Sequence, residues 1–246
     1  MIHVATTRIA LEEACVRVGR SSPAITQCGP RNGSGMSTKR IAGVILAGGN
    51  GRRIGGNKPL RPLRGRPLIE SVISRTRPQV DTLWLSANRK SDGLKPLGLP
   101  IVDDGDDHAG HGPLAGIAAA LSAAQANGFD YLAVVPCDAP FIPPDLVARL
   151  ARSLDAAGAP GAVVRTPRGL QPTFGLWSVE AHESCAAALN AGRLRLGTLC
   201  SEIGMATLWC GEGADEEDGF FNINTRSDLV RAESTLDRLL ARAHIV

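Results

Sequence analysis

Apolar and polar positions follow two different spacings along this chain, and the two kinds of segment alternate from residue 41 onwards. Short apolar runs predict buried strands, and apolar residues that recur every three to four positions predict helices. This alternation is typical of βαβ units and predicts an α/β fold, a single Rossmann-like domain with a mainly parallel sheet flanked by helices. The predicted strands are 41–47, 82–87, 100–103, 131–136, 161–166, 173–178 and 205–210, and the predicted helices are 67–77, 113–127, 144–157, 180–191 and 226–241.

The first 39 residues lack sustained periodicity and end in a stretch rich in turn-forming residues, 27–35. Such a composition disfavours a packed element. We therefore predict a disordered N-terminal extension over 1–39 and a globular domain over 40–246. Met36 directly precedes the first apolar run, and we hypothesise that it is the biological start.

Composition narrows the class of protein. The chain has 246 residues, 43% of them hydrophobic, which is enough for one substantial core. Its 27 basic and 24 acidic residues give a formal net charge of +3, which disfavours a nucleic-acid surface and suits a small anionic substrate. Six scattered cysteines form no C-x-x-C pair, and no apolar run is long enough to span a membrane. These features predict a cytoplasmic protein that contacts neither nucleic acid nor membrane.

A dense series of glycines follows the first predicted strand, over residues 46–58, which read Leu-Ala-Gly-Gly-Asn-Gly-Arg-Arg-Ile-Gly-Gly-Asn-Lys. Glycine lets backbone N–H groups approach phosphate oxygens closely, because no Cβ intervenes. Arg52, Arg53 and Lys58 add positive charge. The stretch therefore indicates a phosphate-binding loop.

Two common phosphate-binding templates do not fit this loop. In the P-loop spacing, Asn57 would occupy the lysine position and Pro59 would follow Lys58 in place of a hydroxyl residue. In the dinucleotide fingerprint, Ile54 would occupy the third glycine position. Neither a P-loop ATPase nor a Rossmann dehydrogenase is predicted.

The loop instead resembles the signature L-A-G-G-x-x-x-R-M-G-x-x-K of the molybdopterin nucleotidyltransferases, which make the dinucleotide forms of the molybdenum cofactor. Here Ile54 replaces the usual methionine, and Asn57 replaces the aspartate common before the lysine. The resemblance implies that Lys58 contacts phosphate. It also implies a nucleotide-binding set that begins with Leu46, Ala47, Gly48 and Gly49.

A second block, Ile-Val-Asp-Asp over 101–104 followed by a Gly-Pro-Leu-Ala-Gly stretch, resembles the family's base-contacting segment. The resemblance implies that Asp104 contacts the guanine nucleotide. A solvated acidic turn is the alternative.

A third block contains an apolar strand, 131–136, that runs into Cys137 and Asp138. An aspartate at the carboxyl end of a strand lies where open α/β sheets bind ligands. Capping of a helix is an equally good interpretation from the residues alone. The following Pro-Phe-Ile-Pro completes the family pattern C-D-x-P-[FY]-I-P. The resemblance therefore favours Asp138 as the ligand of Mg²⁺, which needs only one or two carboxylates besides substrate phosphates. Cys137 is predicted to pack in the strand.

Weaker similarity extends to the segments with which this family binds the pterin that accepts the nucleotide. It implies that Arg195, Asn222 and Asn224 contact the pterin or its phosphate. For the two asparagines, capping of the following helix is an alternative, and Thr225 could share that role.

The resemblance as a whole implies a reaction. GMP would pass from GTP to the terminal phosphate of molybdopterin with release of pyrophosphate, with Lys58, Arg53 and Asp138 as catalytic residues and Mg²⁺ as cofactor. Transient contact with other cofactor-biosynthesis enzymes or with acceptor enzymes is also implied. Three alternatives stay open: a cytidylyltransferase of the same fold, which usually has another small residue where Gly48 stands, a sugar-phosphate nucleotidyltransferase, and a binding module without catalysis.

Overall fold

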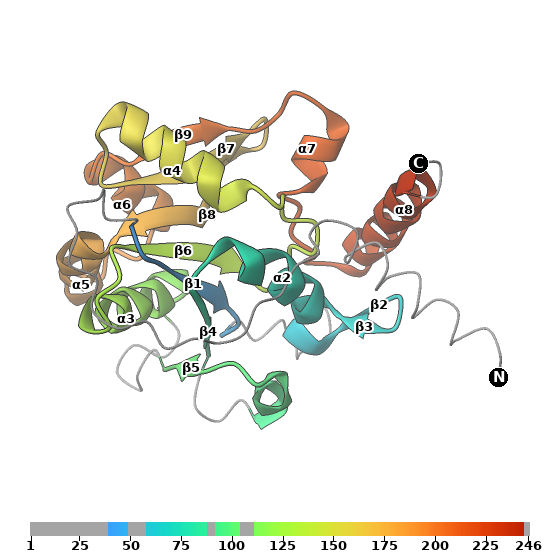
Figure 1. Cartoon of the computed structure of the whole chain (residues 1–246), viewed down its shortest axis with the longest axis horizontal. Helices are drawn as coiled ribbons and strands as arrows, with labels where there is room; N and C mark the ends of the chain where they lie inside the picture. Colours follow the sequence, from blue (N-terminus) through green and yellow to red (C-terminus); the bar gives the residue numbers. More distant parts are fainter. Residues whose placement is uncertain (1–38, 49–57, 88–91, 104–110, 244–246) are drawn as a thin grey trace, which may run out of the picture. The chain divides into compact units, whose positions relative to one another are not determined.

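The computed structural model describes residues 39–48, 58–87, 92–103 and 111–243 (Figure 1). Residues Lys39–Thr235 form one compact unit, and the last turns of the C-terminal helix belong to a second unit. The compact unit is built on a seven-stranded sheet in the order β5-β4-β1-β6-β8-β7-β9. Its strands are β1 (Ile41–Leu46), β4 (Thr82–Ser86), β5 (Ile101–Val102), β6 (Tyr131–Pro136), β7 (Gly161–Thr166), β8 (Gly169–Ser178) and β9 (Ala206–Trp209).

The prediction of a mainly parallel sheet is confirmed. β1 pairs in parallel with both β4 and β6, and the β4–β5 and β7–β9 pairs are parallel as well. Only β8 runs antiparallel to its neighbours β6 and β7. The reason is local: β7 ends at Thr166 and β8 begins at Gly169, and a two-residue connection can only form a hairpin.

Helices cover both faces of the sheet, as the sequence predicted. The five predicted helices correspond to α2 (Leu68–Thr76), α3 (Pro113–Ala126), α4 (Leu146–Ala157), α5 (His182–Asn190) and α8 (Arg226–Ala243). Not predicted were α6 (Leu196–Glu202), α7 (Ala214–Asp218), the hairpin of β2 (Pro62–Leu63) and β3 (Arg66–Pro67), and the 3-10 turns η2 (Lys58–Leu60), η3 (Arg77–Gln79), η4 (Asp92–Leu97) and η6 (Val179–Ala181). Among the described helices, none is long and apolar enough to cross a membrane.

The sheet separates two apolar cores. Alternate residues of one strand point to opposite faces, so Ile45 of β1 packs in the core with α2 and α4, while Val44 packs in the core with α3, α5 and α6. Both side chains are fully buried. A rigid sheet held from both faces fixes the loops that leave its edges.

The start of β1 is held by two carboxylates. Asp130 accepts a hydrogen bond from the Arg40 backbone N–H at 2.7 Å, and Asp81 accepts one from the Ile41 N–H at 2.7 Å. The Arg40 guanidinium also lies 4.4 Å from the centre of the Phe129 ring. These contacts fix the backbone at the start of β1. The predicted disordered extension lies outside the described residues and stays a prediction.

The N-terminal part of α3 lies unusually close to the sheet. A Cβ built on Gly116 would lie 2.2 Å from the Ser86 Oγ of β4 and 3.3 Å from a Leu46 methyl carbon of β1. Only glycine permits this approach. It brings the start of α3 against the carboxyl ends of β1 and β4, the edge at which the candidate site lies.

Candidate active site

The candidate site begins where β1 and β6 end side by side. Leu46 and Pro136 are paired at the ends of the two strands, and the Cys137 N–H donates to the Leu46 carbonyl at 3.2 Å. On the other side of β1, the Ala47 N–H donates to the Ser86 carbonyl at 2.8 Å. The next strand after β1 along the main sheet, β4, lies on one side of the β1–β6 pair, and the next after β6, β7, lies on the other, so the direction of the strand order reverses between β1 and β6. Open α/β sheets bind their ligands at such points.

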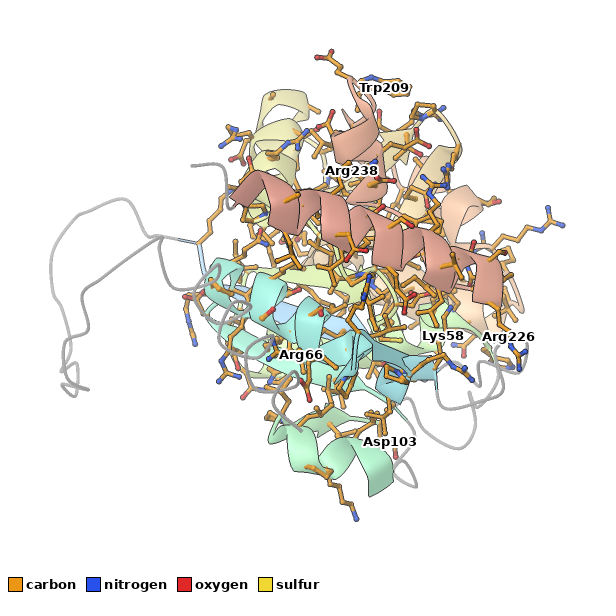
Figure 2. All side chains as sticks on the ribbon, turned by 90° about the vertical axis from the view of Figure 1, so that its right-hand side faces the viewer. Lys58, Arg66, Asp103, Trp209, Arg226 and Arg238 are labelled. Carbon is orange, nitrogen blue, oxygen red and sulfur yellow. The ribbon has the colours of Figure 1, made fainter. Side chains whose placement is uncertain are left out.

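Three side chains from distant parts of the chain meet at this edge. The Lys58 ammonium forms an ion pair with the Asp138 carboxylate and donates a hydrogen bond of 2.7 Å to Asn224 Oδ1. Both charged side chains are largely buried, with 16% of Lys58 and 8% of Asp138 exposed. In Figure 2, Lys58 is labelled beside the first turn of α8, as its bond with Asn224 requires. We call these three residues the lysine cluster.

The segment before α8 is tied to the end of β6. The Ile223 N–H donates to the Asp138 carbonyl at 3.0 Å, and Ile223 is fully buried. The next residues form a capping box: the Asp228 N–H donates to Thr225 Oγ1 at 3.1 Å, and the Thr225 N–H donates to Asp228 Oδ2 at 2.8 Å. Asp228 also accepts from the Asn224 N–H at 2.8 Å. Thr225 therefore caps α8, and the side chain of Asn224 turns to Lys58.

Phe221 anchors the other end of this segment. Its ring faces two guanidiniums, with Arg231 4.4 Å and Arg168 5.7 Å from the ring centre. Arg231 forms an ion pair of 2.8 Å with Asp218, and Arg168 forms one of 2.6 Å with Glu217. Cation–π contacts of this kind each contribute about 0.5–1 kcal/mol near the surface. Together they join the β7–β8 turn, α7 and α8 around the segment that carries Asn224.

The surroundings of Asp138 fit a magnesium ligand. α4 begins at Leu146, so Asp138 is too far from it to cap it. Within the described ranges, no group of three or more His, Cys, Asp or Glu side chains is arranged to hold a metal. A single carboxylate at the ligand edge is what Mg²⁺ needs when substrate phosphates and water supply the other oxygens.

Cys137 packs in the interior of the strand end, as predicted. Burial is the main reason that the pKa of its thiol is raised to about 12, and the negative charge of Asp138 raises it further. The thiol is therefore protonated at neutral pH and is a poor nucleophile.

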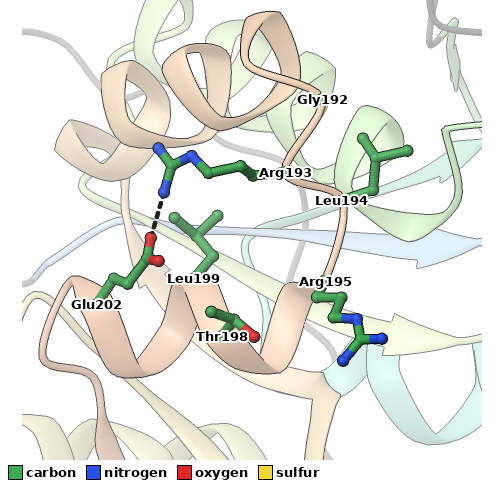
Figure 3. Close-up of a pocket in the computed structure, with 7 residues that line it drawn as sticks. All are labelled: Gly192, Arg193, Leu194, Arg195, Thr198, Leu199 and Glu202. Atoms are coloured by element: carbon green, nitrogen blue, oxygen red, sulfur yellow. Dashed lines mark hydrogen bonds and ion pairs between the residues drawn. The ribbon is translucent and has the colours of Figure 1, made fainter.

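Arg195 lies on another element. It is the residue before α6, and it lines a surface pocket of about 270 Å³ together with Gly192, Arg193, Leu194, Thr198, Leu199 and Glu202. Figure 3 shows Arg193 paired with Glu202, at 2.5 Å, while Arg195 points away from that pair. Among the residues that the structure describes, the Arg195 guanidinium has no hydrogen-bond or ion-pair partner. None of the three residues of the lysine cluster lines this pocket.

Known proteins share this chain's motifs and fold. The model of a family described as "MobA-like NTP transferase domain" matches residues 43–199. The chain belongs to this family. The chain is also similar to a molybdenum cofactor guanylyltransferase of Cereibacter sphaeroides, 41% identical over 80% of this chain and 97% of that protein. Another, from Cupriavidus pinatubonensis, is 39% identical over 77% of this chain and 94% of that protein.

A solved structure agrees with the assignment to the MobA-like family. The molybdopterin-guanine dinucleotide biosynthesis protein A of Archaeoglobus fulgidus superposes with a TM-score of 0.66 at 25% identity, over 80% of this chain and 99% of that one. The chain is therefore a nucleotidyltransferase, and its predicted fold class is confirmed.

Only part of the predicted site falls on the described residues. The structure brings Lys58, Asp138 and Asn224 together. Leu46 is the last residue of β1 at the same edge, and Ala47 and Gly48 follow it. Gly49, Arg53 and Asp104 lie outside the described residues.

Sequence reasoning missed two features that shape this site. Asp228 was not singled out, although Thr-Arg-Ser-Asp over 225–228 has the spacing of a capping box and could have been recognised. Phe221 was not singled out either. Its two guanidinium neighbours come from elements that no local pattern connects.

The capping box gives a prediction for stability. Partial burial would raise the pKa of the Asp228 carboxyl, but the N–H groups of Asn224 and Thr225 and the Thr225 hydroxyl lower it below its ordinary value. A lowered pKa means that the ionised carboxylate stabilises the folded state above about pH 4, the unfolded value, and that this contribution is lost as the pH falls through the folded value.

We therefore expect Asp228→Ala to lower the free energy of unfolding by about 0.5–2 kcal/mol at pH 7. The difference from wild type should shrink as the pH is lowered from 5 to 3, measured by urea unfolding. A difference that stays constant over this range would contradict the role of the ionised carboxylate.

Proposed function

We propose that this nucleotidyltransferase transfers GMP from GTP to the terminal phosphate of molybdopterin, with release of pyrophosphate. The product is the guanine dinucleotide form of the molybdenum cofactor. The observation that carries the proposal is the contact of Lys58 with Asp138, which joins the glycine-rich loop to the end of β6 at the ligand edge of the sheet. Relatives named molybdenum cofactor guanylyltransferase support GTP and the pterin as substrates.

The reaction needs placement and charge neutralisation and no covalent enzyme intermediate. An oxygen of the molybdopterin phosphate attacks the α-phosphorus of GTP, and the bond to the bridging oxygen of pyrophosphate breaks. Lys58 and Arg53 would stabilise negative charge on the α-phosphate and on the departing pyrophosphate. The backbone of residues 46–49 would hold the nucleotide, because N–H groups without intervening side chains can reach its oxygens.

Asp138 would hold Mg²⁺ through its carboxylate. When bound, the ion supplies further neutralisation of the phosphate charge. The negative charge of the Asp138 carboxylate, which otherwise neutralises Lys58, would be balanced by Mg²⁺. The positive charge of the Lys58 ammonium would then be available to the phosphates. Charge balance at this edge therefore favours a highly anionic ligand such as a nucleoside triphosphate.

The acceptor side rests on fewer observations. Arg195 offers a guanidinium without a described partner, and it lines a pocket large enough for a small organic group. Asn222 carries a buried Oδ1 atom to which no described residue donates. We propose both as acceptor contacts.

Asp104 is proposed to contact the guanine base. The protein is proposed to act in the cytoplasm, in transient contact with other cofactor-biosynthesis enzymes or with acceptor enzymes.

The substrate choice can be tested directly. We expect Mg²⁺-dependent release of pyrophosphate when GTP and molybdopterin are supplied together, and none when either is left out. Phosphate detection coupled to pyrophosphatase measures the rate. Release with CTP in place of GTP would instead favour the cytidylyltransferase, and nucleotide binding without any release would favour a binding module.

Lys58 should be essential for rate. We expect Lys58→Ala to lower kcat by a factor of about 10²–10³, the usual effect of removing one donor that stabilises developing negative charge. Lys95→Ala removes a lysine from the exposed η4 turn and serves as the matched control. Near-normal turnover of Lys58→Ala, with Lys95→Ala also normal, would refute the role of Lys58.

A further inference from the structure

Within the described part of the chain, two of the three N–H donors of the Lys58 ammonium have partners. An ammonium has three N–H donors and no acceptor. One is directed at Asp138 and a second at Asn224. Among the described residues, no third acceptor contacts this ammonium, so one N–H remains for a ligand oxygen.

Chemistry fixes the orientation of the Asn224 amide. A lysine can only donate, so the atom that faces it must be the amide oxygen. The amide nitrogen then faces the other way and donates to the Asn222 carbonyl at 3.4 Å. The backbone is held as well, by the bond from the Asn224 N–H to Asp228. Asn224 is thus a fixed acceptor, supported by the start of α8.

The two partners of Lys58 differ in what they can do during catalysis. Asp138 is the proposed ligand of Mg²⁺, and a carboxylate oxygen bound to a divalent cation is a poorer partner for an ammonium. Asn224 has no such second task, and its neutral amide adds no negative charge beside a triphosphate. A flexible four-carbon lysine side chain needs such an anchor to keep its charge at one place.

We infer that Asn224 is a positioning residue that holds the Lys58 ammonium toward the nucleotide phosphates. It therefore acts on the nucleotide side of the reaction, whereas the sequence suggested an acceptor contact. Both polar atoms of its side chain are used within the protein, while Asn222 Oδ1 is buried and lacks a described donor. This inference rests on the proposed function, because it needs Lys58 to contact GTP.

The test is to measure GTP affinity and acceptor KM separately. We expect Asn224→Ala to weaken binding of GTP with Mg²⁺ about tenfold, the size expected for a lost hydrogen bond to a charged group. Isothermal titration calorimetry measures this without turnover. The KM for molybdopterin should stay within about twofold of wild type, since residues that contact the acceptor are unchanged.

A double-mutant cycle shows whether Asn224 acts through Lys58. In the Lys58→Ala background, Asn224→Ala should weaken GTP binding no further. Ser227→Ala, in the first turn of α8, removes a 2.8 Å hydrogen bond to the Thr225 hydroxyl but no described contact with Lys58. It is the matched control for a lost hydrogen bond at the start of α8 and should bind GTP like wild type. Thermal unfolding of each variant establishes that it is folded, and if Lys58→Ala does not fold, the separate GTP and acceptor measurements on Asn224→Ala decide.

The outcomes are distinct. Unchanged GTP affinity in Asn224→Ala, a rise in acceptor KM alone, or equal losses in both backgrounds would overturn the inference while the proposed function stands. A wild-type chain that does not bind GTP would overturn both.

Discussion

The arrangement of this site depends on one ion pair, between Lys58 and Asp138. Its members come from different connections of the sheet, and each is largely buried. Removing two charges from water carries a large desolvation penalty, which is offset only when the geometry is good and the remaining donors and acceptors have partners. Here the sheet brings the two residues to one edge, and Asn224 takes a further N–H of the ammonium. A buried pair of this kind adds little to stability, but it holds Lys58 against the end of β6.

The segment before α8, residues 221–225, completes the site, although it belongs to no strand of the sheet. A backbone bond from Ile223 to Asp138 and a side-chain bond from Asn224 to Lys58 make two independent ties to the same ion pair. Phe221, between its two guanidiniums, and the capping box at Thr225 hold the segment at its two ends. The segment lies beyond residue 199, where the family match ends. Residues on either side of that limit therefore share one site.

The sequence predicted the central strands well, because a buried strand is a continuous apolar run with polar residues at its ends. The bounds of β6 and β7 agree with the prediction at both ends. β8 begins earlier than predicted, at Gly169. Its first four residues, Gly-Leu-Gln-Pro, form no continuous apolar run, and they belong to the strand because it pairs with β7 in a hairpin. α6 was missed since seven residues give fewer than two full turns, too few for a period to be recognised.

The sequence predicted the site residues that stand in local motifs and missed the contacts between distant segments. Lys58 and Asp138 each stand in a local motif, and the rule that strands of a parallel sheet end at one edge places them together. The contact of Lys58 with Asn224 joins residues 166 positions apart, and no local spacing predicts it. The same holds for the pocket beside Arg195, which exists only because α6 folds there.

The central claim is that the edge formed by β1 and β6 holds a nucleoside triphosphate between Lys58 and a metal on Asp138. A crystal structure of the chain with Mn²⁺ and a GTP analogue that cannot be cleaved at the α-phosphorus tests it most directly. The account predicts an anomalous peak for Mn²⁺ within coordination distance of an Asp138 oxygen, with Lys58 against a phosphate. A metal and triphosphate bound elsewhere, with the Lys58–Asp138 pair intact, would contradict it.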